Sequence, residues 1–578
     1  MLSIKRLIFL FCLLSIPCST FGADIYITQA TSGSDTGASC ANAHSASWFN
    51  TNATGGNVYH LCGTFTGTAG QTILTIPASG TAGPGNDLKV LFETGAILAA
   101  PYWSLNGAIH INGKNYITID GGSNGVIENT ANGSGLTYQA DTAGLLVEGN
   151  SSHIEIKNLT VTNMYVREIS LASLDRAGGT SWGVQNTSSG TDISIHNNNV
   201  SWCSGAILSG GSGGTNFNIY SNTTRHMNWG IYITPSSDAA ISNYNVYSND
   251  ISDWSGWECP GGGAAGICAA GVSPWDSGTT YSIDQRVTSG GLIWRSKVNS
   301  NYGNTPENGS YWQDMDVFHQ DGIFIAGHHI ISTTPINIYS NYIHGLTGGS
   351  PSASIFLTLQ PYSYTLDDLP GPRVYVYNNI ITPDPVRGGI GVIASGSGAS
   401  NWFYNNTIEA GGSGASCFIF SSAGVKTLVN NICINAKLGI ETWDSYMGGP
   451  QYTLGTVDYN IWYNSCQMGH CWSDINHMAW KDNLTDWRAV GFDVHGSVSD
   501  PVFVSASNYH LQATSPAIGT ATSTVTPLTY TTDYAGVARG ASWDIGAYEY
   551  SGASGQSISI GAGSQSIGIG GGSKTLSW

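Results

Sequence analysis

A short motif centred on asparagine recurs through the middle and later part of the chain. Seven segments share the order apolar, any, polar, Asn, any and, in most copies, a β-branched residue: IHNNNV (195–200), IYSNTT (219–224), VYSNDI (246–251), IYSNYI (338–343), VYNNII (376–381), FYNNTI (403–408) and LVNNIC (428–433). The asparagines therefore recur in steps of 24, 27, 92, 38, 27 and 25 residues. Apart from the long step, this period is far shorter than a globular domain and indicates a stacked repeat.

A period of this length holds two or three short strands and their turns, which predicts a parallel β-helix. Successive coils of such a fold stack at about 4.8 Å. An asparagine at the same corner of every coil can bond its amide to the asparagines above and below, as in other stacked β structures. We therefore expect an inward asparagine ladder with a structural role and no catalytic one.

The composition supports an all-β chain. Glycine accounts for 76 of 578 residues, and charged residues for only 10%, against about 25% in average proteins. This excludes coiled coils and helical solenoids. Hydrophobic residues reach 41% and aromatic residues 11%, which is too much apolar surface for a disordered chain.

The first 23 residues have the build of a secretory signal peptide. Lys5 and Arg6 precede the apolar run Leu7 to Ile16, and small residues follow. No later segment is long and apolar enough to span a membrane. Without the leader, 17 basic and 37 acidic residues give a net charge of −20. We expect a secreted monomer that binds neither nucleic acid nor anionic lipid.

Nine cysteines remain in the exported chain, where an oxidising compartment favours disulfides. Eight lie in close pairs along the sequence, which predicts the bonds Cys40–Cys62, Cys259–Cys268, Cys417–Cys433 and Cys466–Cys471. Cys203 is left over, and we expect it to be a buried thiol in the core.

Between the asparagine corners lie further strands with a glycine followed by apolar residues, such as GIYI (230–233) and GIFI (322–325). Alternation along these strands places Ile231, Ile323 and Ile355 inside the coil and Tyr232, Phe324 and Phe356 outside it in register. Such an outward aromatic file either stacks on pyranose rings or is covered by loops. The residues leave these two alternatives open.

With these features the chain resembles the secreted right-handed parallel β-helix proteins of the pectate-lyase-like superfamily. The resemblance covers about residues 24 to 550. It rests on the repeat, on YITIDGGSNGVIEN (116–129) and on the closing motifs DPVF (500–503), YHLQATSPAIG (509–519) and DYAGVARGASWDIGAYEY (533–550). It implies the architecture and leaves the chemistry open, because one scaffold carries many activities.

The 92-residue step contains an insertion. Removing about 56 residues, from Cys259 to about Met315, leaves 36, which is an ordinary coil. Residues 274–314 resemble a chitin- or cellulose-binding carbohydrate module of the type called family 5/12. The resemblance rests on Trp275, Tyr281, Val287, Gly291, Trp294, Ser296, Asn299, Pro306 and Trp312.

Some aromatic residues of this insertion must form its own core, because a module of about 40 residues has little else to bury. We expect Trp275, Tyr281 and Trp312 to face sugar, since flat rings suit pyranose faces, and Trp294 to lie in the core. An insertion that only decorates the β-helix or mediates protein contacts is the alternative.

The densest cluster of reactive side chains follows the insertion, in DMDVFHQDGIF (314–324). We expect Asp316, His319 and Asp321 to form the catalytic centre, with paired carboxylates for hydrolysis or with calcium on Asp314, Asp316 and Asp321 for uronate elimination. Strict alternation would point Asp321 inward, unless Gly322 breaks the pattern. No cofactor is certain, and calcium is expected only for a lyase.

A second candidate site is the groove that Asp253, Glu258 and His344 would line. If Asp321 only caps a core corner, we expect the chemistry in this groove. The net charge favours hydrolysis of a neutral polysaccharide over elimination from a polyuronate.

The sequence thus predicts a secreted protein that binds and depolymerises a polysaccharide, with a noncatalytic glycan-binding or cell-surface protein as the alternative. The expected units are a signal peptide (1–23), an N-terminal β-helix part (24–258), the inserted module (259–315), a C-terminal β-helix part (316–550) and a Gly/Ser-rich tail (551–578).

Overall fold

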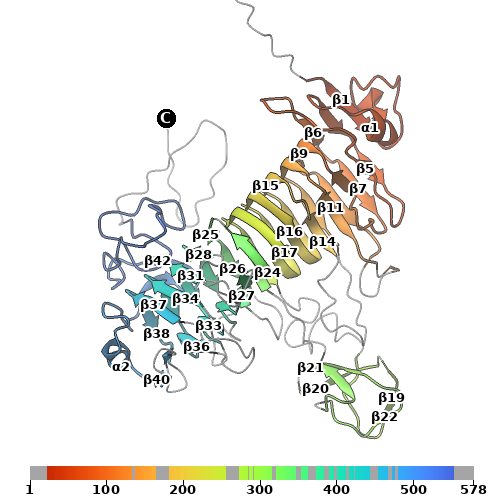
Figure 1. Cartoon of the computed structure of the whole chain (residues 1–578). Coiled ribbons are helices and arrows are strands. Elements are labelled where there is room, and N and C mark those ends of the chain that lie inside the picture. The colour runs from red at the N-terminus through yellow and green to blue at the C-terminus, as the bar shows by residue number, and fades with distance from the viewer. Residues whose placement is uncertain are drawn as a thin grey trace, which may run out of the picture.

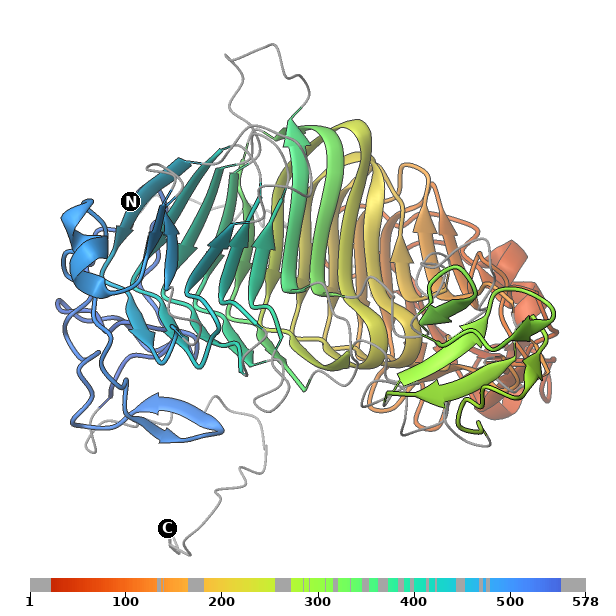
Figure 2. The ribbon, with the colours of Figure 1, turned by 90° about the horizontal axis from the view of Figure 1, so that it is seen from below.

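The described part of the chain folds as a right-handed parallel β-helix. The computed structural model describes residues 22–551, apart from gaps at 133–136, 139, 165–180, 255–271, 284, 291, 307, 315–320, 333, 346–352, 362–372, 383–388, 396–399, 412–414, 422–423, 443–452, 467–470 and 475–478. The predicted leader and the tail from residue 552 lie outside these residues. Figure 2 shows the coils stacked in chain order along one axis.

Thirty-five described strands form one continuous sheet that winds around the axis. Each coil contributes one strand to each of three faces, and strands of successive coils pair in parallel register, as in Tyr220 with Tyr247 and Tyr247 with Tyr339. Two long strands, β16 (Asn199–Tyr220) and β17 (Thr223–Tyr247), run through face 2, face 3 and face 1 in turn.

Face 1 holds β1 (Asp24–Thr28), β3 (Val58–Leu61), β6 (Leu88–Phe92), β9 (Asn115–Asp120), β12 (Ser152–Lys157), β15 (Thr191–His196), β25 (Ile336–Tyr339), β28 (Arg373–Tyr377), β31 (Ser400–Tyr404), β34 (Val425–Val429) and β37 (Thr453–Asp458). Face 2 holds β4 (Thr64–Thr66), β7 (Ile97–Ala100), β10 (Val126–Asn129), β13 (Thr160–Thr162), β18 (Asp250–Trp254), β26 (Tyr342–His344), β29 (Ile380–Thr382), β32 (Thr407–Glu409), β35 (Ile432–Ile434) and β38 (Ile461–Tyr463).

Face 3 holds β5 (Leu74–Thr75), β8 (Ile109–Asn112), β11 (Ala143–Glu148), β14 (Trp182–Asn186), β24 (Asp321–Ser332), β27 (Ala353–Pro361), β30 (Val392–Ala394), β33 (Phe418–Phe420), β36 (Ile440–Thr442) and β39 (Trp472–Asp474), and β40 (Ala479–Lys481) pairs with its last strand. Inward columns of branched residues fill the interior, among them Ile231, Ile323 and Ile355 with no exposed surface. This confirms the inward positions that the sequence predicts.

The asparagine ladder runs along the corner between face 1 and face 2. From Asn222 onward the side chains use their full bonding capacity: the Nδ2 of Asn222 donates to the Oδ1 of Asn249 (3.0 Å) and to the carbonyl of Ile195 (2.9 Å). Its Oδ1 accepts from the backbone N (3.1 Å) and the Nδ2 (3.0 Å) of Asn198. Four bonds per buried amide satisfy every polar atom, so the ladder joins the coils without orphaned groups.

The long step in the sequence does not interrupt the ladder. Asn249 donates from Nδ2 to the Oδ1 of Asn341 at 3.0 Å, although 92 residues separate them, and Asn379 bonds Asn406 in the same way at 3.0 Å. These bonds confirm that the ladder asparagines lie one coil apart.

The residue before each ladder asparagine has a left-handed backbone, for example Ser221 at φ 53°, Asn378 at 53° and Asn430 at 61°. Short polar residues tolerate this conformation best. The recurring Ser-Asn and Asn-Asn pairs therefore encode the corner as well as the ladder.

Two further members extend the ladder beyond the seven copies of the motif. Asn431 bonds Asn460 (3.0 Å), and the Nδ2 of Asn460 donates to the Oδ1 of Asp493 (2.9 Å). The other oxygen of Asp493 accepts from the indole Nε1 atoms of Trp462 (2.8 Å) and Trp487 (3.0 Å). Asp493 therefore ends the ladder as an acceptor that is bonded on both oxygens.

A second ladder on the outside of face 1 is built from the tyrosines two positions before the asparagines. The rings of Tyr220, Tyr247, Tyr339 and Tyr377 stack at centroid spacings of 4.8 Å. Tyr530 from the C-terminal segment stacks on Tyr377 at 4.8 Å and covers that end. Because neighbouring rings cover each other's faces, this tyrosine ladder contributes to packing and presents only ring edges to the surroundings.

Short elements close the ends of the stack, and disulfides crosslink its coils. The 3-10 turn η1 (Cys40–Asn42), β2 (His44–Ser45) and α1 (Ala46–Asn52) lie at the N-terminal end, and α2 (Leu484–Ala489) lies at the other. Disulfides join Cys40 to Cys62, Cys417 to Cys433 and Cys466 to Cys471, as the sequence predicts. Cys203 is a buried free thiol. The predicted pair Cys259–Cys268 lies outside the described residues.

The inserted segment forms sheets of its own (Figure 1). One sheet pairs β19 (Thr280–Tyr281) with β22 (Asn301–Tyr302), and the other orders β20 (Arg286–Ser289), β21 (Leu292–Ser296) and β23 (Trp312–Asp314).

The segment from residue 500 to 550, here called the closing segment, folds back onto the β-helix. Its hairpin of β41 (Phe503–Ser505) and β42 (Asn508–Leu511) and its later residues pack on the outside of face 2. Ile380, Ile432 and Ile461 lie under this cover with Tyr509 and Ile545. Among the described helices, none has the length and apolar character that crossing a membrane requires.

Replacing Asn341 by alanine tests the ladder. The change leaves the amide of Asn249 and the carbonyl of Val246 unpaired in the interior, so we expect a loss of about 3 kcal/mol in the free energy of unfolding. Asn337→Ala is the matched control, because this asparagine lies on the outside of the same coil with a bond to Asn245; it should cost less than about 1 kcal/mol. Equal losses in denaturant unfolding would contradict the structural role of the ladder.

Asp493 gives the fold a predicted pH dependence. Burial raises the pKa of Asp493 to about 6, against the lowering effect of hydrogen bonds from Trp487, Asn460 and Trp462. The folded state therefore takes up a proton near pH 6, whereas the unfolded state does so near pH 4. Between these values, lowering the pH stabilises the wild type by up to about 3 kcal/mol relative to Asp493→Asn, which does not titrate. Urea midpoints of both proteins at pH 7 and pH 4 measure the difference, and a constant difference would refute this role.

Candidate functional site

Of the predicted catalytic cluster, only Asp321 belongs to the described residues, because Asp316 and His319 lie outside them. Asp321 opens β24 and has no exposed surface. Its Oδ1 accepts a hydrogen bond from the backbone N of Ala353 in the next coil at 2.9 Å. In this position the carboxylate ties β24 to β27.

Gly322 breaks the alternation along β24. A Cβ built on Gly322 would point at Ile343 Cγ2 and the Ser354 carbonyl, both at 2.7 Å, so Gly322 faces the core, as does its neighbour Ile323. Asp321 pairs in register with Trp229, whose ring packs against Tyr232 at 5.3 Å in a cluster outside the main core. Asp321 therefore belongs to the outer column of face 3 and is nevertheless buried.

The predicted aromatic file on face 3 exists in register, and its rings stack on each other. Tyr232 lies 4.8 Å from Phe324, which lies 5.1 Å from Phe356, at interplanar angles of 12° and 23°. Phe324 is only 9% exposed. Ile393 follows Phe356 in the register. A sugar needs an open ring face to stack on, and the middle ring of this file has none.

An exposed cluster of charged residues lies on the outside of face 2. Asp250 in β18 stands between Arg225 of the preceding coil and His344 of the following one. Its Oδ2 accepts from Arg225 Nη2 at 3.2 Å, and its Oδ1 lies 2.8 Å from His344 Nε2. All three side chains contact solvent.

The sequence places these side chains by simple alternation. The first and third residues after each ladder asparagine point outward, and the second, such as Ile251 or Ile343, is buried in the core. Thr223, Asp250 and Tyr342 thus form one outward column, with Arg225, Ser252 and His344 in the next.

Electrostatics keep Asp250 ionised. Burial alone would raise the pKa of Asp250, but the hydrogen bond and charge of His344 and the charge of Arg225 outweigh it and lower the pKa. The His344 ring stacks on Tyr342 at 3.9 Å. When Nε2–H donates to Asp250, Nδ1 carries the lone pair of a base. The pair therefore suits proton abstraction, and the ionised Asp250 is unsuited to act as a general acid.

A second histidine and carboxylate pair lies at the next corner. His226 Nε2 is 3.8 Å from Asp253 Oδ2, and the indole of Trp202 stacks on His226 at 4.0 Å with an interplanar angle of 8°. Burial lowers the pKa of His226, as does Arg225, while Asp253 opposes them. Trp202 is 41% exposed. Asp253 and His344 of the second predicted groove thus lie on one face, and Glu258 lies outside the described residues.

A tyrosine-lined pocket adjoins this cluster where the closing segment begins to cover face 2. Its volume is about 110 Å³, and it is lined by Tyr342, Ile380, Ser507, Asn508, Tyr509, Tyr534 and Tyr548. Burial raises the pKa of Tyr534 to about 12, and the negative charge of Asp250 contributes to the shift. The phenol therefore stays protonated at neutral pH and presents a hydrogen-bond donor beside Asp250.

In the inserted module the structure corrects two of the expected sugar contacts. Tyr281 and Trp312 are 5% and 1% exposed and pack at 5.1 Å around Val287. The module is so small that its largest rings must fill its interior. Trp275 and Trp294 are partly buried against this core, with Trp294 donating to the Ser289 carbonyl at 3.1 Å.

The exposed aromatic residues of the module are Tyr302, at 61%, and Tyr311, at 38%. Neither tyrosine is among the sugar contacts that the sequence predicts. An indication was available in Asn301, which alternates with Tyr302 in β22 and is buried, so that its neighbour must face outward.

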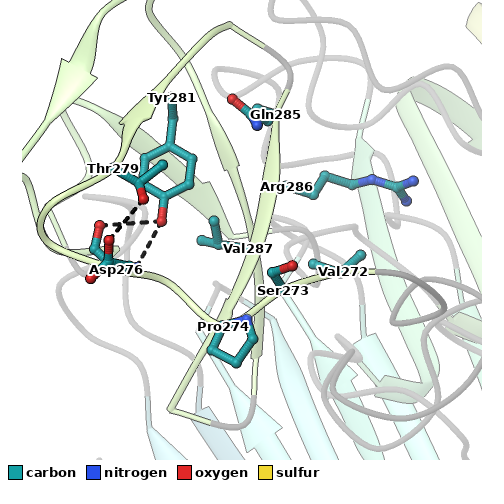
Figure 3. Close-up of a pocket in the computed structure, with 9 residues that line it drawn as sticks. All are labelled: Val272, Ser273, Pro274, Asp276, Thr279, Tyr281, Gln285, Arg286 and Val287. Carbon is teal, nitrogen blue, oxygen red and sulfur yellow. Dashed lines mark hydrogen bonds between the residues drawn. The ribbon is translucent and has the colours of Figure 1, made fainter.

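A depression of about 520 Å³ lies at the start of the module (Figure 3). It is lined by Val272, Ser273, Pro274, Asp276, Thr279, Tyr281, Gln285, Arg286 and Val287. The Tyr281 hydroxyl accepts from the Asp276 backbone N (2.7 Å) and donates to its carbonyl (3.2 Å), and Thr279 donates to the Asp276 carboxylate (2.7 Å). Because the Tyr281 ring is buried, this depression offers no aromatic face to a sugar.

Sequence reasoning missed Asp250, Trp202 and Tyr342, the residues that complete the face 2 cluster. For Asp250 and Tyr342 the signal was present in their distance from the ladder asparagines, since each directly follows its asparagine and so belongs to an outward column. Trp202 follows Asn198 by four residues, at a corner with a left-handed backbone, and lies outside these columns. The tyrosines of the closing segment gave no such signal, because only the fold brings them to this place.

No protein-family model matches the chain, and a comparison with curated proteins finds no match. Among solved structures, the chain is similar to pectate lyase Pel9A (13% identity, 92% of this chain and 97% of that chain, TM-score 0.40). It is similar also to the A-module of the Azotobacter vinelandii mannuronan C-5 epimerase AlgE4 (12%, 70% and 79%, 0.32) and to a tailspike protein of an E. coli bacteriophage (9%, 71% and 70%, 0.32). Scores this low establish no shared function.

If the module binds a glycan through its exposed tyrosines, removing their rings weakens that binding. In the full chain, the double change Tyr302→Ala and Tyr311→Ala should weaken retention on insoluble chitin or cellulose at least fivefold, because each ring contributes on the order of 1 kcal/mol of contact. Ile283→Ala is the control, because Ile283 is 36% exposed on the same module, close to the 38% of Tyr311. Trp312→Ala should instead lower the stability of the module. Unchanged retention by the folded double variant would contradict binding through these rings.

Proposed function

We propose that the protein is a secreted carbohydrate-active enzyme that binds and depolymerises an extracellular polysaccharide on the outside of face 2. The reaction centre of this proposal is the pair of His344 and Asp250, and the surface from Trp202 to Tyr342 is here called the face 2 groove. Three disulfides and the predicted leader support export.

The observation that carries the proposal is the position of a base among aromatic side chains. His344 is held by the carboxylate of Asp250 at 2.8 Å and lies against the ring of Tyr342. An exposed indole, Trp202, lies on the same face. A positioned base supplies proton transfer, and flat rings with polar neighbours hold sugar rings.

Two chemistries fit this arrangement. In hydrolysis, His344 would take a proton from the attacking water, while the glycosidic C–O bond breaks and the phenol of Tyr534 gives its proton to the leaving oxygen. In elimination from a uronate, His344 would take the proton next to the carboxylate, a C=C bond would form as the C–O bond to the leaving sugar breaks, and Tyr534 would again protonate the leaving oxygen, with Arg225 offsetting charge. We favour hydrolysis of a neutral or weakly charged glycan, because the chain without its predicted leader has a net charge of −20 and repels a polyanion.

Calcium-assisted elimination at Asp316 and Asp321 is a separate hypothesis. No three His, Cys, Asp or Glu side chains converge as metal ligands among the residues that the structure describes. The buried Asp321 bonds a backbone amide, which supports a structural role for it.

A noncatalytic glycan-binding protein is the second candidate function. The observation that favours it is the inserted module, whose exposed Tyr302 and Tyr311 would give binding without any chemistry on the β-helix.

A panel of neutral and uronate polysaccharides, assayed for new reducing ends and for the absorbance of unsaturated uronates, tests these proposals. We expect new reducing ends without that absorbance, and a decrease of 10²-fold or more in kcat/KM for His344→Ala. His495→Ala is the matched control, because His495 also pairs with an aspartate, Asp458 at 2.8 Å, and stacks on a tyrosine, away from the groove.

The outcomes separate the hypotheses. Full activity of a folded His344→Ala variant would refute the proposed centre. Loss of turnover in Asp321→Asn, with stability unchanged, would move the centre to Asp321. Binding without turnover on any polymer would favour the noncatalytic function.

A further inference from the structure

We propose that the face 2 groove is closed at its C-terminal end and that the protein shortens its polysaccharide from a chain end, releasing short products. This inference rests on the proposed function and adds the mode of attack. It follows from where the closing segment covers face 2 along the β-helix axis.

Among the residues that the structure describes, the outward side chains of face 2 keep contact with solvent on the N-terminal side of the reaction centre. Thr162, Ser201 and Arg225 follow one another in register on the outside of face 2, and these residues are half-buried or exposed. The cover that the closing segment provides begins at Tyr342 and continues over the later coils from Ile380. A glycan can therefore lie along the earlier coils.

Trp202 provides the contact on this open side. It belongs to the coil three rungs before Tyr342, which corresponds to about 14 Å at the usual strand spacing. Its ring packs in parallel on His226 and is 41% exposed. This distance places Trp202 under a sugar well upstream of the one above His344.

On the other side the groove ends at the tyrosine pocket. The polymer cannot continue along face 2, because Tyr509, Tyr534 and Tyr548 of the closing segment stand on the surface beyond Tyr342. Tyr509 is held there by a hydrogen bond from its hydroxyl to Glu409 Oε2 at 2.5 Å.

The size of the pocket limits what it accepts. Its volume of about 110 Å³ is well below the roughly 300 Å³ of pockets that enclose drug-sized ligands. It therefore suits the end of a glycan chain, with Tyr534 and Asn508 as hydrogen-bonding groups. The bond attacked above His344 then lies close to that end.

The time course of the products tests the mode of attack on any polymer that the wild type cleaves. Chain-end attack releases short oligosaccharides from the first turnovers, while the viscosity of the solution falls slowly relative to the gain in reducing ends. A rapid fall in viscosity with products of mixed length would overturn the closed-end inference and leave the proposed function intact. If no polymer is cleaved, the proposed function fails first.

Two variants test the two ends of the groove. Ser507→Trp fills the pocket from an exposed loop and should reduce turnover at least tenfold, whereas Val504→Trp, at an exposed site of the same hairpin that does not line the pocket, should not. Equal turnover of both variants would contradict a chain end in the pocket.

Trp202→Ala should raise KM for the polymer about fivefold with little change in kcat, and should leave KM for the shortest cleavable oligosaccharide unchanged. Trp480→Ala removes another exposed tryptophan, on β40, and is the control. An unchanged KM for the polymer would overturn the contact at Trp202.

Discussion

The amide-to-amide hydrogen bond between successive ladder asparagines governs the register of much of this β-helix. Each amide has two donors and two acceptor sites, and from Asn222 to Asn460 all of them are used inside the protein. A slip by one residue would leave these groups buried and unpaired, at about 1–3 kcal/mol for each group. The ladder therefore specifies which residues of every coil face inward and which form outward columns.

This register decides which side chains become neighbours in the outward columns. Tyrosines two positions before the ladder stack on face 1, and Asp250, Tyr342, Arg225 and His344 come together on face 2. The insertion of the module between Asn249 and Asn341 leaves both columns intact, because the ladder bond closes across it. A long insertion is tolerated because it leaves from a corner, where it interrupts no inward residue.

The closing segment determines how much of face 2 is open. Arg539, whose side chain is fully buried, donates to the carbonyls of Asp544 and Gly546 and to the Asn378 side chain (2.9 Å). The Tyr530 hydroxyl bonds Asn405 at 2.6 Å. These contacts hold the segment against the corner of the β-helix, so that its tyrosines end the groove at Tyr342. On face 3, by contrast, Tyr232, Phe324 and Phe356 stack on one another, so their contacting ring faces are not open to a sugar.

The sequence by itself determined the coil architecture, the inward isoleucines and the asparagine ladder. These features depend on spacing along the chain, because alternation within each strand and the repeat period decide which residues face the interior. It also determined three disulfides from their short loops. Only the tertiary structure decided which aromatic rings keep an open face: Trp312 fills the module core and Tyr302 does not. It likewise decided that Asp250 meets His344, 94 residues away, beside Tyr534. Such contacts depend on packing between segments that are distant in the sequence, and no local sequence pattern predicts them.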